Sequence, residues 1–258
     1  MSSKFHVVIP ARFESSRLPG KPTLKIAGKP MIIRVVEQAL KSGASSVVVA
    51  TDDSRIKKIV TSAGYMALMT SVAHQSGSDR VAEIADKMGW PEESVVVNVQ
   101  GDEPLIPPGV ISQVAGILSA KYKEPSAGVA TLFVPIETQK ELFDSNVVKV
   151  VVDIAGRALY FSRAPVPWSR SEFGAPGNHV SEPQEWKRHV GIYAYTVRAL
   201  RNFVALPASR LELIESLEQL RLLENGVQIM MQAACEYVPG GIDTEQDYEK
   251  ICNDLDGK

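Results

Sequence analysis

The segment FHVVIPARFESSRLPGKPT, residues 5–23, decides the fold, because an apolar run passes directly into a turn that is rich in cations. The run HVVI lacks the polar alternation of a half-exposed strand, which predicts a strand covered on both faces. The turn then holds Arg12, Arg17 and Lys21 around Gly20 and two prolines. Because the prolines limit the conformations between these cations, the turn can present them to an anion with little loss of entropy.

Two further β-branched runs, SVVVA at residues 46–50 and SVVVNV at residues 94–99, repeat the pattern of the first strand. Apolar residues between and after the runs recur at the spacing of amphipathic helices. These stripes run from Ile32 to Leu40, Ile56 to Ala63, Val81 to Met88 and Val110 to Leu118. The βαβαβ order predicts the α/β class, with a Rossmann-like, mainly parallel sheet, helices on both faces and a ligand crevice at the carboxyl ends of the strands.

The chain changes character from about residue 128, where strand-like runs VATLFVP, VVKVVVD and ALYFSRAPVPW precede a Gly/Pro-rich loop at residues 169–183. A loop of this length is usually functional or mobile. We therefore expect one catalytic domain over residues 1–258, with a smaller lid or dimerisation subdomain inserted at residues 128–188. After the insertion we expect a strand over HVGIYAYT, a helix with the stripe Leu213, Leu217 and Leu220, and a closing helix from Thr244 to Leu255.

Composition excludes several classes of protein. The 258 residues are 45% hydrophobic and carry a formal net charge of −2, which gives no general attraction to nucleic acid or to anionic membranes. No apolar stretch approaches the roughly 20 residues that cross a bilayer, and the N-terminus lacks the core of a secretion signal, so we expect a cytoplasmic protein. Cys235 and Cys252 lie far from any CxxC spacing and are expected to be free thiols without a role.

The opening turn differs from two common phosphate-binding loops. A Walker loop requires a glycine five residues before Gly20 and a serine or threonine after Lys21, but Ser15 and Pro22 stand there. The GxGxxG pattern of dinucleotide-binding folds is absent as well. On charge alone, a phosphate site and a solvated loop are equally good explanations of this turn.

Two acidic segments are candidates for a metal site. Asp102, in VVVNVQGDEPLIPP, follows a buried strand, where a carboxylate can hold Mg²⁺ together with phosphate oxygens and water. A turn-forming aspartate is an equal alternative. Helix capping alone would explain Asp243 or Thr244 in VPGGIDTEQDYEKI, although the two preceding glycines would let the backbone approach a ligand closely.

A third polar segment, HQSGSDR at residues 74–80, lies just before the third helix stripe. It offers hydroxyls and backbone amides at a helix start, and the amide side chain of Gln75 can hydrogen-bond the edge of a base. Plain helix capping by Ser78 is a fair alternative. The segment is therefore consistent with one wall of a nucleotide site.

The order of residues in FHVVIPARFESSRLPGKPTLKIAGKPMI closely resembles the signature with which sugar-nucleotide cytidylyltransferases begin, in which the loop wraps the phosphates of CTP. NVQGDEP and GIDTEQD resemble the two metal segments of this family, which implies that Asp102 and Asp243 bind one Mg²⁺ or an adjacent pair. HQSGSDR would recognise cytosine and ribose, and members often carry threonine where Ser78 stands. The nucleotide-binding residues implied by the resemblance are Ala11, Arg12, Arg17, Lys21, Gln75, Ser76, Gly77, Ser78, Arg80 and Gln100.

Three later segments, ALYFSRAPVPW, RHVGIYAYT and RLELIESLEQLR, resemble the branch of the family that activates 3-deoxy-manno-octulosonate, the eight-carbon keto acid of lipopolysaccharide. The resemblance implies that Arg163 pairs with the sugar carboxylate. The other implied sugar-binding residues are Gln100, His189, Tyr193, Glu218 and Gln219. The loop SRSEFGAPGNHVSEPQEWK cannot be aligned by motif, so Trp186, Lys187 and Arg188 receive no role.

The implied reaction converts CTP and the keto-sugar acid into the CMP-sugar and pyrophosphate. Lys21 and Arg17 would stabilise the departing pyrophosphate, and Mg²⁺ on Asp102 and Asp243 would polarise the α-phosphate. The family resemblance also implies a homodimer, in which ALYFSRAPVPW is either interface or core. Two alternatives remain open at this point: a cytidylyltransferase for a sialic-acid-type sugar, and a nucleotide-binding sensor without catalysis.

Overall fold

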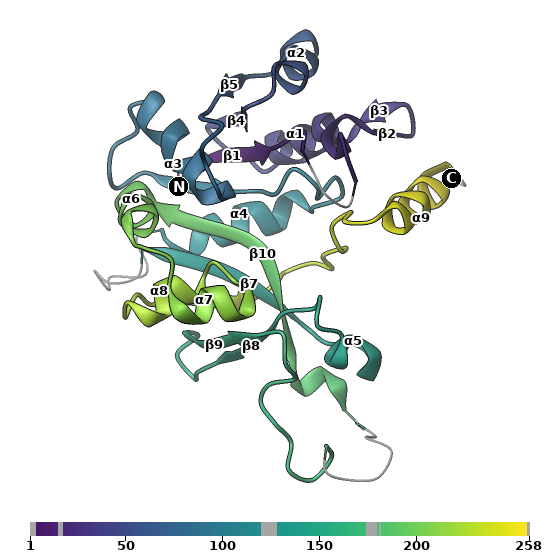
Figure 1. The fold of residues 1–258 in the computed structure, drawn as a ribbon, viewed down its shortest axis with the longest axis vertical. Helices are drawn as coiled ribbons and strands as arrows, with labels where there is room; N and C mark the ends of the chain where they lie inside the picture. The colour runs from purple at the N-terminus through teal and green to yellow at the C-terminus, as the bar shows by residue number, and fades with distance from the viewer. Residues whose placement is uncertain (1–3, 15–17, 120–127, 174–179, 181, 257–258) are drawn as a thin grey trace.

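The computed structural model describes residues 4–14, 18–119, 128–173, 180 and 182–256, and the predicted phosphate-binding Arg17 lies outside them. These residues form a central nine-stranded sheet with helices on both sides and a separate two-stranded hairpin (Figure 1). This arrangement confirms the predicted α/β class. None of the described helices combines the length and the apolar character needed to span a membrane.

The N-terminal half of the sheet is parallel, as predicted. The strand β1 (Phe5–Ala11) pairs with β4 (Ser46–Thr51) on one side and with β6 (Val95–Asn98) on the other, and β5 (Ala67–Met69) pairs with β4. Most of their residues are buried because helices cover both faces. The carboxyl ends of β1 and β6 therefore meet at one edge of the sheet.

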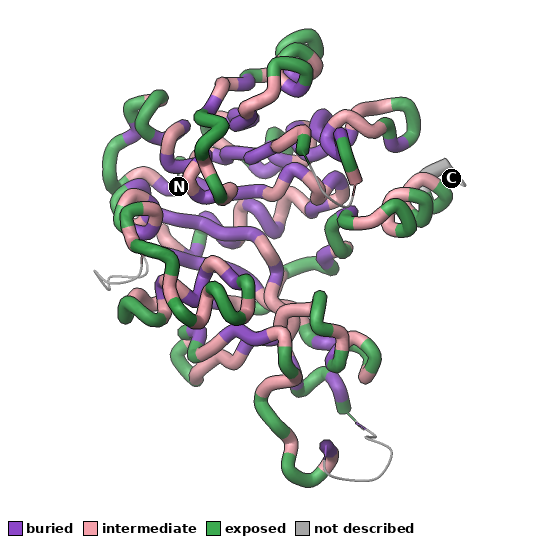
Figure 2. Tube along the Cα trace, in the orientation of Figure 1, coloured by how far each residue is buried: buried purple, intermediate pink, exposed green. Residues whose placement is uncertain are grey.

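Helices cover the two faces of the sheet in separate layers. Three pack against one face: α1 (Met31–Lys41), α2 (Ser54–Ser62) and α4 (Pro108–Ile117). Three pack against the other: α3 (Gly77–Lys87), α6 (Val197–Ala205) and α8 (Leu220–Glu224). The four predicted helix stripes are thus confirmed, and Figure 2 shows buried positions concentrated in the strands between the layers.

The C-terminal half of the sheet is mixed. The strand β10 (Lys187–Thr196) runs antiparallel to β6 and to β7 (Val129–Pro135), while β11 (Ile229–Ala233) is parallel to β7. Because β7 lies within the central sheet, the first strand of the expected 128–188 subdomain is part of the core. The strand β8 (Lys149–Val152) pairs with β10 and with β9 (Ala158–Ser162), so both extend the same sheet. They lie at the lower end of Figure 1 together with α5 (Gln139–Phe143) and a 3₁₀ turn at Pro183–Glu185.

The helix predicted from Leu213, Leu217 and Leu220 is wrong, because two short helices replace it. The helix α7 (Arg210–Glu215) ends at Ser216, whose φ of 52° is left-handed, and α8 begins four residues later. Leu213 is exposed, whereas Leu217 and Leu220 are buried. Between the two helices, Leu217 and Gln219 are buried, and Leu217 joins the core on the α3 side of the sheet.

The closing helix α9 (Glu245–Asp256) confirms the prediction and packs against the hairpin of β2 (Lys25–Ile26) and β3 (Lys29–Pro30). The hydroxyl of Tyr248 donates to the carbonyl of Lys25 at 2.7 Å, and Ile242 packs in a small core with Ile26 and Met31. This packing carries the segment before α9 to the opening turn of the chain. Cys235 and Cys252 are free, as expected.

Candidate active site

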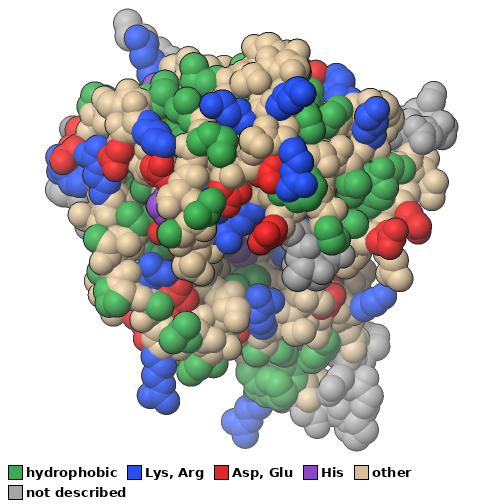
Figure 3. Space-filling model, turned by 45° about the horizontal axis from the view of Figure 1, so that its top comes forward, with side chains coloured by type: hydrophobic (Ala, Val, Ile, Leu, Met, Phe, Trp, Pro, Cys, Tyr) green, Lys and Arg blue, Asp and Glu red, His purple; other side chains and the backbone are tan. Residues whose placement is uncertain are grey.

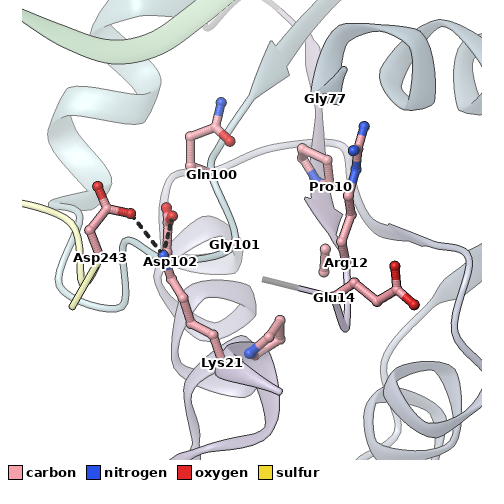
Figure 4. Close-up of a pocket in the computed structure, with 11 residues that line it drawn as sticks. Pro10, Arg12, Glu14, Lys21, Gly77, Gln100, Gly101, Asp102 and Asp243 are labelled. Atoms are coloured by element: carbon pink, nitrogen blue, oxygen red, sulfur yellow. Dashed lines mark hydrogen bonds and ion pairs between the residues drawn. The ribbon is translucent and has the colours of Figure 1, made fainter. Parts of the chain in front are cut away.

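A cleft of about 360 Å³ opens at the carboxyl ends of β1 and β6, the position expected for a ligand in a parallel sheet (Figure 4). Its lining comes from segments that are distant in the sequence. The residues are Pro10, Ala11, Arg12, Glu14, Lys21, Pro22, Gly77, Gln100, Gly101, Asp102 and Asp243. The fold thus brings several predicted nucleotide-binding residues together with both predicted metal ligands.

The opening turn directs Lys21 into the cleft. Gly20 has a φ of 70°, and a Cβ at this position would lie 3.2 Å from the ring of Phe13, so both backbone and space favour glycine. The amide of Gly20 donates to the carbonyl of Phe13 at 3.0 Å. The single 3₁₀ turn Lys21–Thr23 follows, and only 10% of the Lys21 side chain remains exposed.

The ammonium group of Lys21 lies between two carboxylates. Its Nζ is 2.7 Å from Oδ2 of Asp102 and 3.1 Å from Oδ1 of Asp243, as the dashed lines in Figure 4 show. Asp102 follows β6, and Asp243 precedes α9. The two acids therefore converge on the same side of the cleft, and a cation fits between them.

Close backbone contacts fix the segments that carry the two acids. A Cβ at Gly101 would lie 2.8 Å from the carbonyl oxygen of Pro10, so only glycine allows the loop after β6 to touch β1. The amide of Ile242 donates to the carbonyl of Asp102 at 3.0 Å. The separation of the two carboxylates is thus set by main-chain hydrogen bonding and not by flexible side chains alone.

Helix capping does not explain the Asp243 side chain. Thr244 and Asp247 cap the start of α9: the Asp247 amide donates to Oγ1 of Thr244 at 3.2 Å, and the Thr244 amide donates to Oδ2 of Asp247 at 2.8 Å. The capping alternative is therefore correct for Thr244 only. The carboxylate of Asp243 points instead to Lys21.

Glu103, for which no role was predicted, has a carboxyl group enclosed behind the cleft. Its Oε2 has no hydrogen-bond partner. Burial, with smaller effects of Asp102 and Asp243 and opposed by Arg188, raises the pKa of Glu103 to about 8. The group is therefore largely protonated at neutral pH, and only its position next to Asp102 in the sequence hinted at a place near the site.

The predicted nucleotide wall differs from expectation in its cap. Ser76, not Ser78, caps α3: its Oγ accepts from the Asp79 amide at 3.1 Å, and Asp79 Oδ2 accepts from the Ser76 amide at 2.9 Å. The buried Ser78 donates instead to Oε2 of Glu218 at 3.2 Å. This contact joins the wall to the segment that precedes α8.

Arg12 lines the cleft, whereas Arg80 and Gln75 lie outside its lining. The Nη2 of Arg12 donates to the carbonyl of His74 at 3.0 Å. Arg80 is 1% exposed, and its Nη2 donates to Oδ2 of Asp52 at 2.6 Å behind the wall. Gln75 is exposed on the surface. Arg80 therefore supports the wall in this structure.

The predicted sugar-binding residues of β10 are uncharged at neutral pH. Burial, with a smaller effect of Arg188, lowers the pKa of His189 to about 3, and burial raises the pKa of Tyr193. The two rings pack with their centroids 5.3 Å apart. His189 Nε2 also lies 3.2 Å from Oγ1 of Thr131 in β7. This side of the site offers hydrogen-bonding groups without net charge.

The break between α7 and α8 brings Glu218 and Gln219 to the same region. Burial raises the pKa of Glu218, opposed by hydrogen bonds from Ser76 and Ser78. Gln219 is buried, and its Nε2 has no hydrogen-bond partner. Glu218 and Gln219 therefore bring two partly or fully buried polar side chains to the segment before α8.

Arg163 is tied to main-chain carbonyls in this structure. Its Nε donates to Glu215 at 2.7 Å, its Nη1 to Ser145 at 2.9 Å, and its Nη2 to Ser216 at 3.4 Å. The carboxylate of Glu215 in turn accepts from Oγ of Ser162 at 2.6 Å and from the Arg163 amide at 2.9 Å. Glu215 was not predicted, since its position on a helix stripe gave no sign of this partner.

The chain is similar to known proteins over nearly its whole length. The family profile described as Cytidylyltransferase matches residues 6–229. A protein of Nitrosococcus oceani named 3-deoxy-manno-octulosonate cytidylyltransferase is 51% identical over 248 residues, covering 96% of this chain and 95% of the relative. A protein of the same name from Pseudomonas syringae pv. syringae is 50% identical over 257 residues and covers both chains completely.

Solved structures match over the same length. A structure of CMP:2-keto-3-deoxy-manno-octonic acid synthetase complexed with CTP has a TM-score of 0.84 and 42% identity, and covers 99% of both chains. A cytidylyltransferase from Leptospira borgpetersenii has a TM-score of 0.60 at 16% identity, with 99% of this chain and 88% of that chain covered. The second likeness concerns the fold alone.

Proposed function

The chain belongs to the cytidylyltransferase family, and from that premise we infer that it transfers CMP from CTP to the anomeric hydroxyl of 3-deoxy-D-manno-octulosonate. The products are the CMP-sugar and pyrophosphate, and the reaction serves lipopolysaccharide biosynthesis. Relatives with this name are 50–51% identical over nearly the whole chain. The observation in the structure that carries the proposal is the convergence of Lys21, Asp102 and Asp243 at the carboxyl edge of the sheet.

Transfer of a nucleotidyl group depends on positioning and on neutralising the charge of phosphoryl oxygens, so basic side chains matter more than a covalent nucleophile. Arg12 and Lys21 line the cleft that we assign to CTP. Lys21 would hold the departing pyrophosphate, together with Arg17. Because the ammonium group is bound to two carboxylates here, Lys21 must exchange them for phosphate oxygens when CTP binds.

Asp102 and Asp243 would hold Mg²⁺. Their carboxylate oxygens are the hard ligands that this ion prefers, and the ammonium group between them supports a cation site here. When bound, Mg²⁺ would polarise the α-phosphate and lower the pKa of the attacking hydroxyl. The contribution of the chain is to keep the two acids together before the substrates arrive.

The acceptor sugar would occupy the side formed by β10 and the segment before α8. Tyr193, His189, Glu218 and Gln219 lie there with groups that suit sugar hydroxyls. Arg163 uses three of its five N–H groups on main-chain carbonyls and keeps two for the sugar carboxylate. Gln100, on the cleft, would contact both substrates.

The experiment that tests the proposal measures pyrophosphate release from CTP and Mg²⁺ with each of two acceptors, 3-deoxy-D-manno-octulosonate and a sialic acid. We expect release with the first sugar at a kcat/KM that exceeds the second by at least about 100-fold, because unmatched hydroxyls leave buried polar groups unpaired. Preference for the sialic acid would change the acceptor assignment. Binding of CTP without release under any condition would instead indicate a sensor.

We also propose a homodimer that works in the cytoplasm. Leu159 in β9 and Leu213 and Ile214 in α7 are large, apolar and exposed, and Glu215 joins these two elements. Exposed apolar side chains on adjacent elements favour burial against a second copy. On the face in Figure 3, basic and acidic side chains are interspersed, which supports small-molecule substrates over nucleic acid or a membrane as partners.

A further inference from the structure

Asn98 is an exception within its strand. The other residues of β6, Val95, Val96 and Val97, are buried and apolar, and Asn98 is equally buried at 3% exposed. Its Oδ1 is buried and has no hydrogen-bond partner. A buried amide oxygen without a partner destabilises the free protein, so a valine or leucine would suit the fold better.

Strand register places Asn98 at the junction of the two halves of the site. Asn98 is the direct partner of Tyr193 in the antiparallel pair β6–β10, so the two side chains lie on the same face of the sheet. On its other side, the Nδ2 lies 3.8 Å from the point that a Cβ of Gly77 would occupy, and Pro10 is 3.3 Å from that point. Gly77 and Pro10 both line the cleft.

Unsatisfied polar groups accumulate around this junction. The hydroxyl of Tyr193 lies near Thr131 but makes no hydrogen bond of good geometry, and Nε2 of Gln219 has no partner. Gln219 follows Glu218, which accepts a hydrogen bond from Ser78 one residue beyond Gly77. Internal polar groups of a folded protein are normally paired, so several open ones in one region indicate a polar ligand.

We propose that Asn98 is a specificity-determining residue whose side-chain amide hydrogen-bonds a hydroxyl of the acceptor sugar close to the reacting centre. The inference rests on the proposed function and adds a residue to it. The acceptor must bring its anomeric hydroxyl to the α-phosphate of CTP, and Asn98 lies between the wall at Gly77 and the acceptor side at Tyr193. An amide suits this place because it can both donate and accept.

The test compares Asn98→Leu, which keeps the shape but loses both polar atoms, with the smaller Asn98→Ala. The matched control is Gln228→Met, because Oε1 of Gln228 is also buried without a partner. Gln228 precedes the first residue of β11 and so lies at the amino end of that strand, away from the carboxyl edge that holds the cleft. Measurements are kcat/KM for the acceptor, the Kd of CTP with Mg²⁺ by titration calorimetry without acceptor, and the urea midpoint of unfolding.

For both Asn98 variants we expect kcat/KM for the acceptor to fall about tenfold and the Kd of CTP to change less than about twofold. The midpoint of Asn98→Leu should equal or exceed that of the wild type. Gln228→Met should keep wild-type kinetics.

An unchanged acceptor kcat/KM in both Asn98 variants would overturn the inference. Weaker binding of CTP with normal acceptor kinetics would also overturn it, because Asn98 would then contact the ribose. A lowered midpoint in both variants with normal kinetics would make Asn98 structural. A wild-type protein that releases no pyrophosphate would contradict both the proposed function and this assignment.

Discussion

The two sides of the cleft are built in opposite ways. On the nucleotide side, charged groups of the protein neutralise one another: Lys21 binds Asp102 at 2.7 Å, and Arg80 binds Asp52 at 2.6 Å. On the acceptor side, Asn98 and Tyr193 are buried with hydrogen-bonding atoms that have no partner. The nucleotide side must exchange internal partners for substrate. The acceptor side has polar groups without partners, which destabilise the free protein.

The strongest test of this contrast is Lys21→Ala. Removing one preorganised contact to phosphoryl charge typically lowers turnover about 100- to 1000-fold, or about 3 to 4 kcal/mol. We expect kcat for pyrophosphate release to fall by this factor, while the free energy of unfolding changes by less than about 1 kcal/mol. The small change in stability is expected because the side chains of Asp102 and Asp243 are 33% and 51% exposed and water can solvate them.

The matched control for Lys21→Ala is Lys29→Ala. Lys29 also forms an ion pair, with Glu37 at 2.7 Å, but does not line the cleft. It should retain wild-type kcat. If Lys21→Ala retains near-normal kcat as well, Lys21 has no place in the reaction and the nucleotide side is only a structural ion pair.

Arg80→Met should instead act mainly on stability. The guanidinium group is almost fully buried, and its loss leaves Asp52 without its partner, which typically costs about 3 kcal/mol or more. We expect the free energy of unfolding in urea to fall by about 3 kcal/mol, the low end of this range, because Asp52 keeps some contact with solvent. The double variant Arg80→Met/Asp52→Asn should recover part of it. Equal losses in the single and double variants would show that packing, not charge, dominates.

The ammonium group of Lys21 and a divalent ion should compete for the carboxylates of Asp102 and Asp243. In Lys21→Met, we expect Mn²⁺ to bind the protein about tenfold more tightly in the absence of CTP, equivalent to about 1.4 kcal/mol, because no ammonium group has to leave. Electron paramagnetic resonance of free Mn²⁺ measures this affinity. Asp102→Asn in the same background should abolish the gain. An unchanged affinity would mean that the ion binds elsewhere.

The sequence predicts the framework better than it predicts the site. Uninterrupted β-branched runs and helix stripes identify β1, β4, β6 and α1 to α4, because both depend on local periodicity. Periodicity did not predict the break at Ser216, which has a left-handed backbone. Arg163, distant in the sequence, donates hydrogen bonds to the carbonyls of Glu215 and Ser216 at this break. It also could not show that β10 enters the sheet between β6 and β7.

The site residues depend on contacts between distant segments. Nothing in the spacing of Asp102 and Asp243 says that they meet; the family resemblance implied it, and the packing of α9 on the β2–β3 hairpin produces it. Asn98 was treated as one more strand residue, although an amide in a valine-only run is the kind of local inconsistency that marks functional positions. The polar Asn98 within a buried valine run is thus the sequence signal that marks this position.

The smallest effect tests whether the acceptor side is held uncharged. Burial lowers the pKa of His189 to about 3, below its ordinary value near 6.5, so the unfolded chain binds a proton that the folded chain does not between these pH values. Stability from the neutral imidazole is therefore complete above about pH 6.5 and is lost as the pH falls below it. The loss cannot exceed about 1.4 kcal/mol per pH unit and should be smaller, because the residue keeps some exposed surface.

We expect urea unfolding at pH 7.5, 6.5 and 5.5 to show the free energy of the wild type decreasing relative to that of His189→Gln only below pH 6.5. Glutamine is a suitable replacement because it can still hydrogen-bond Thr131 without titrating. A difference between the two proteins that stays constant with pH would mean that His189 accepts a proton in place. The acceptor side would then tolerate charge, and the contrast with the nucleotide side would be one of degree.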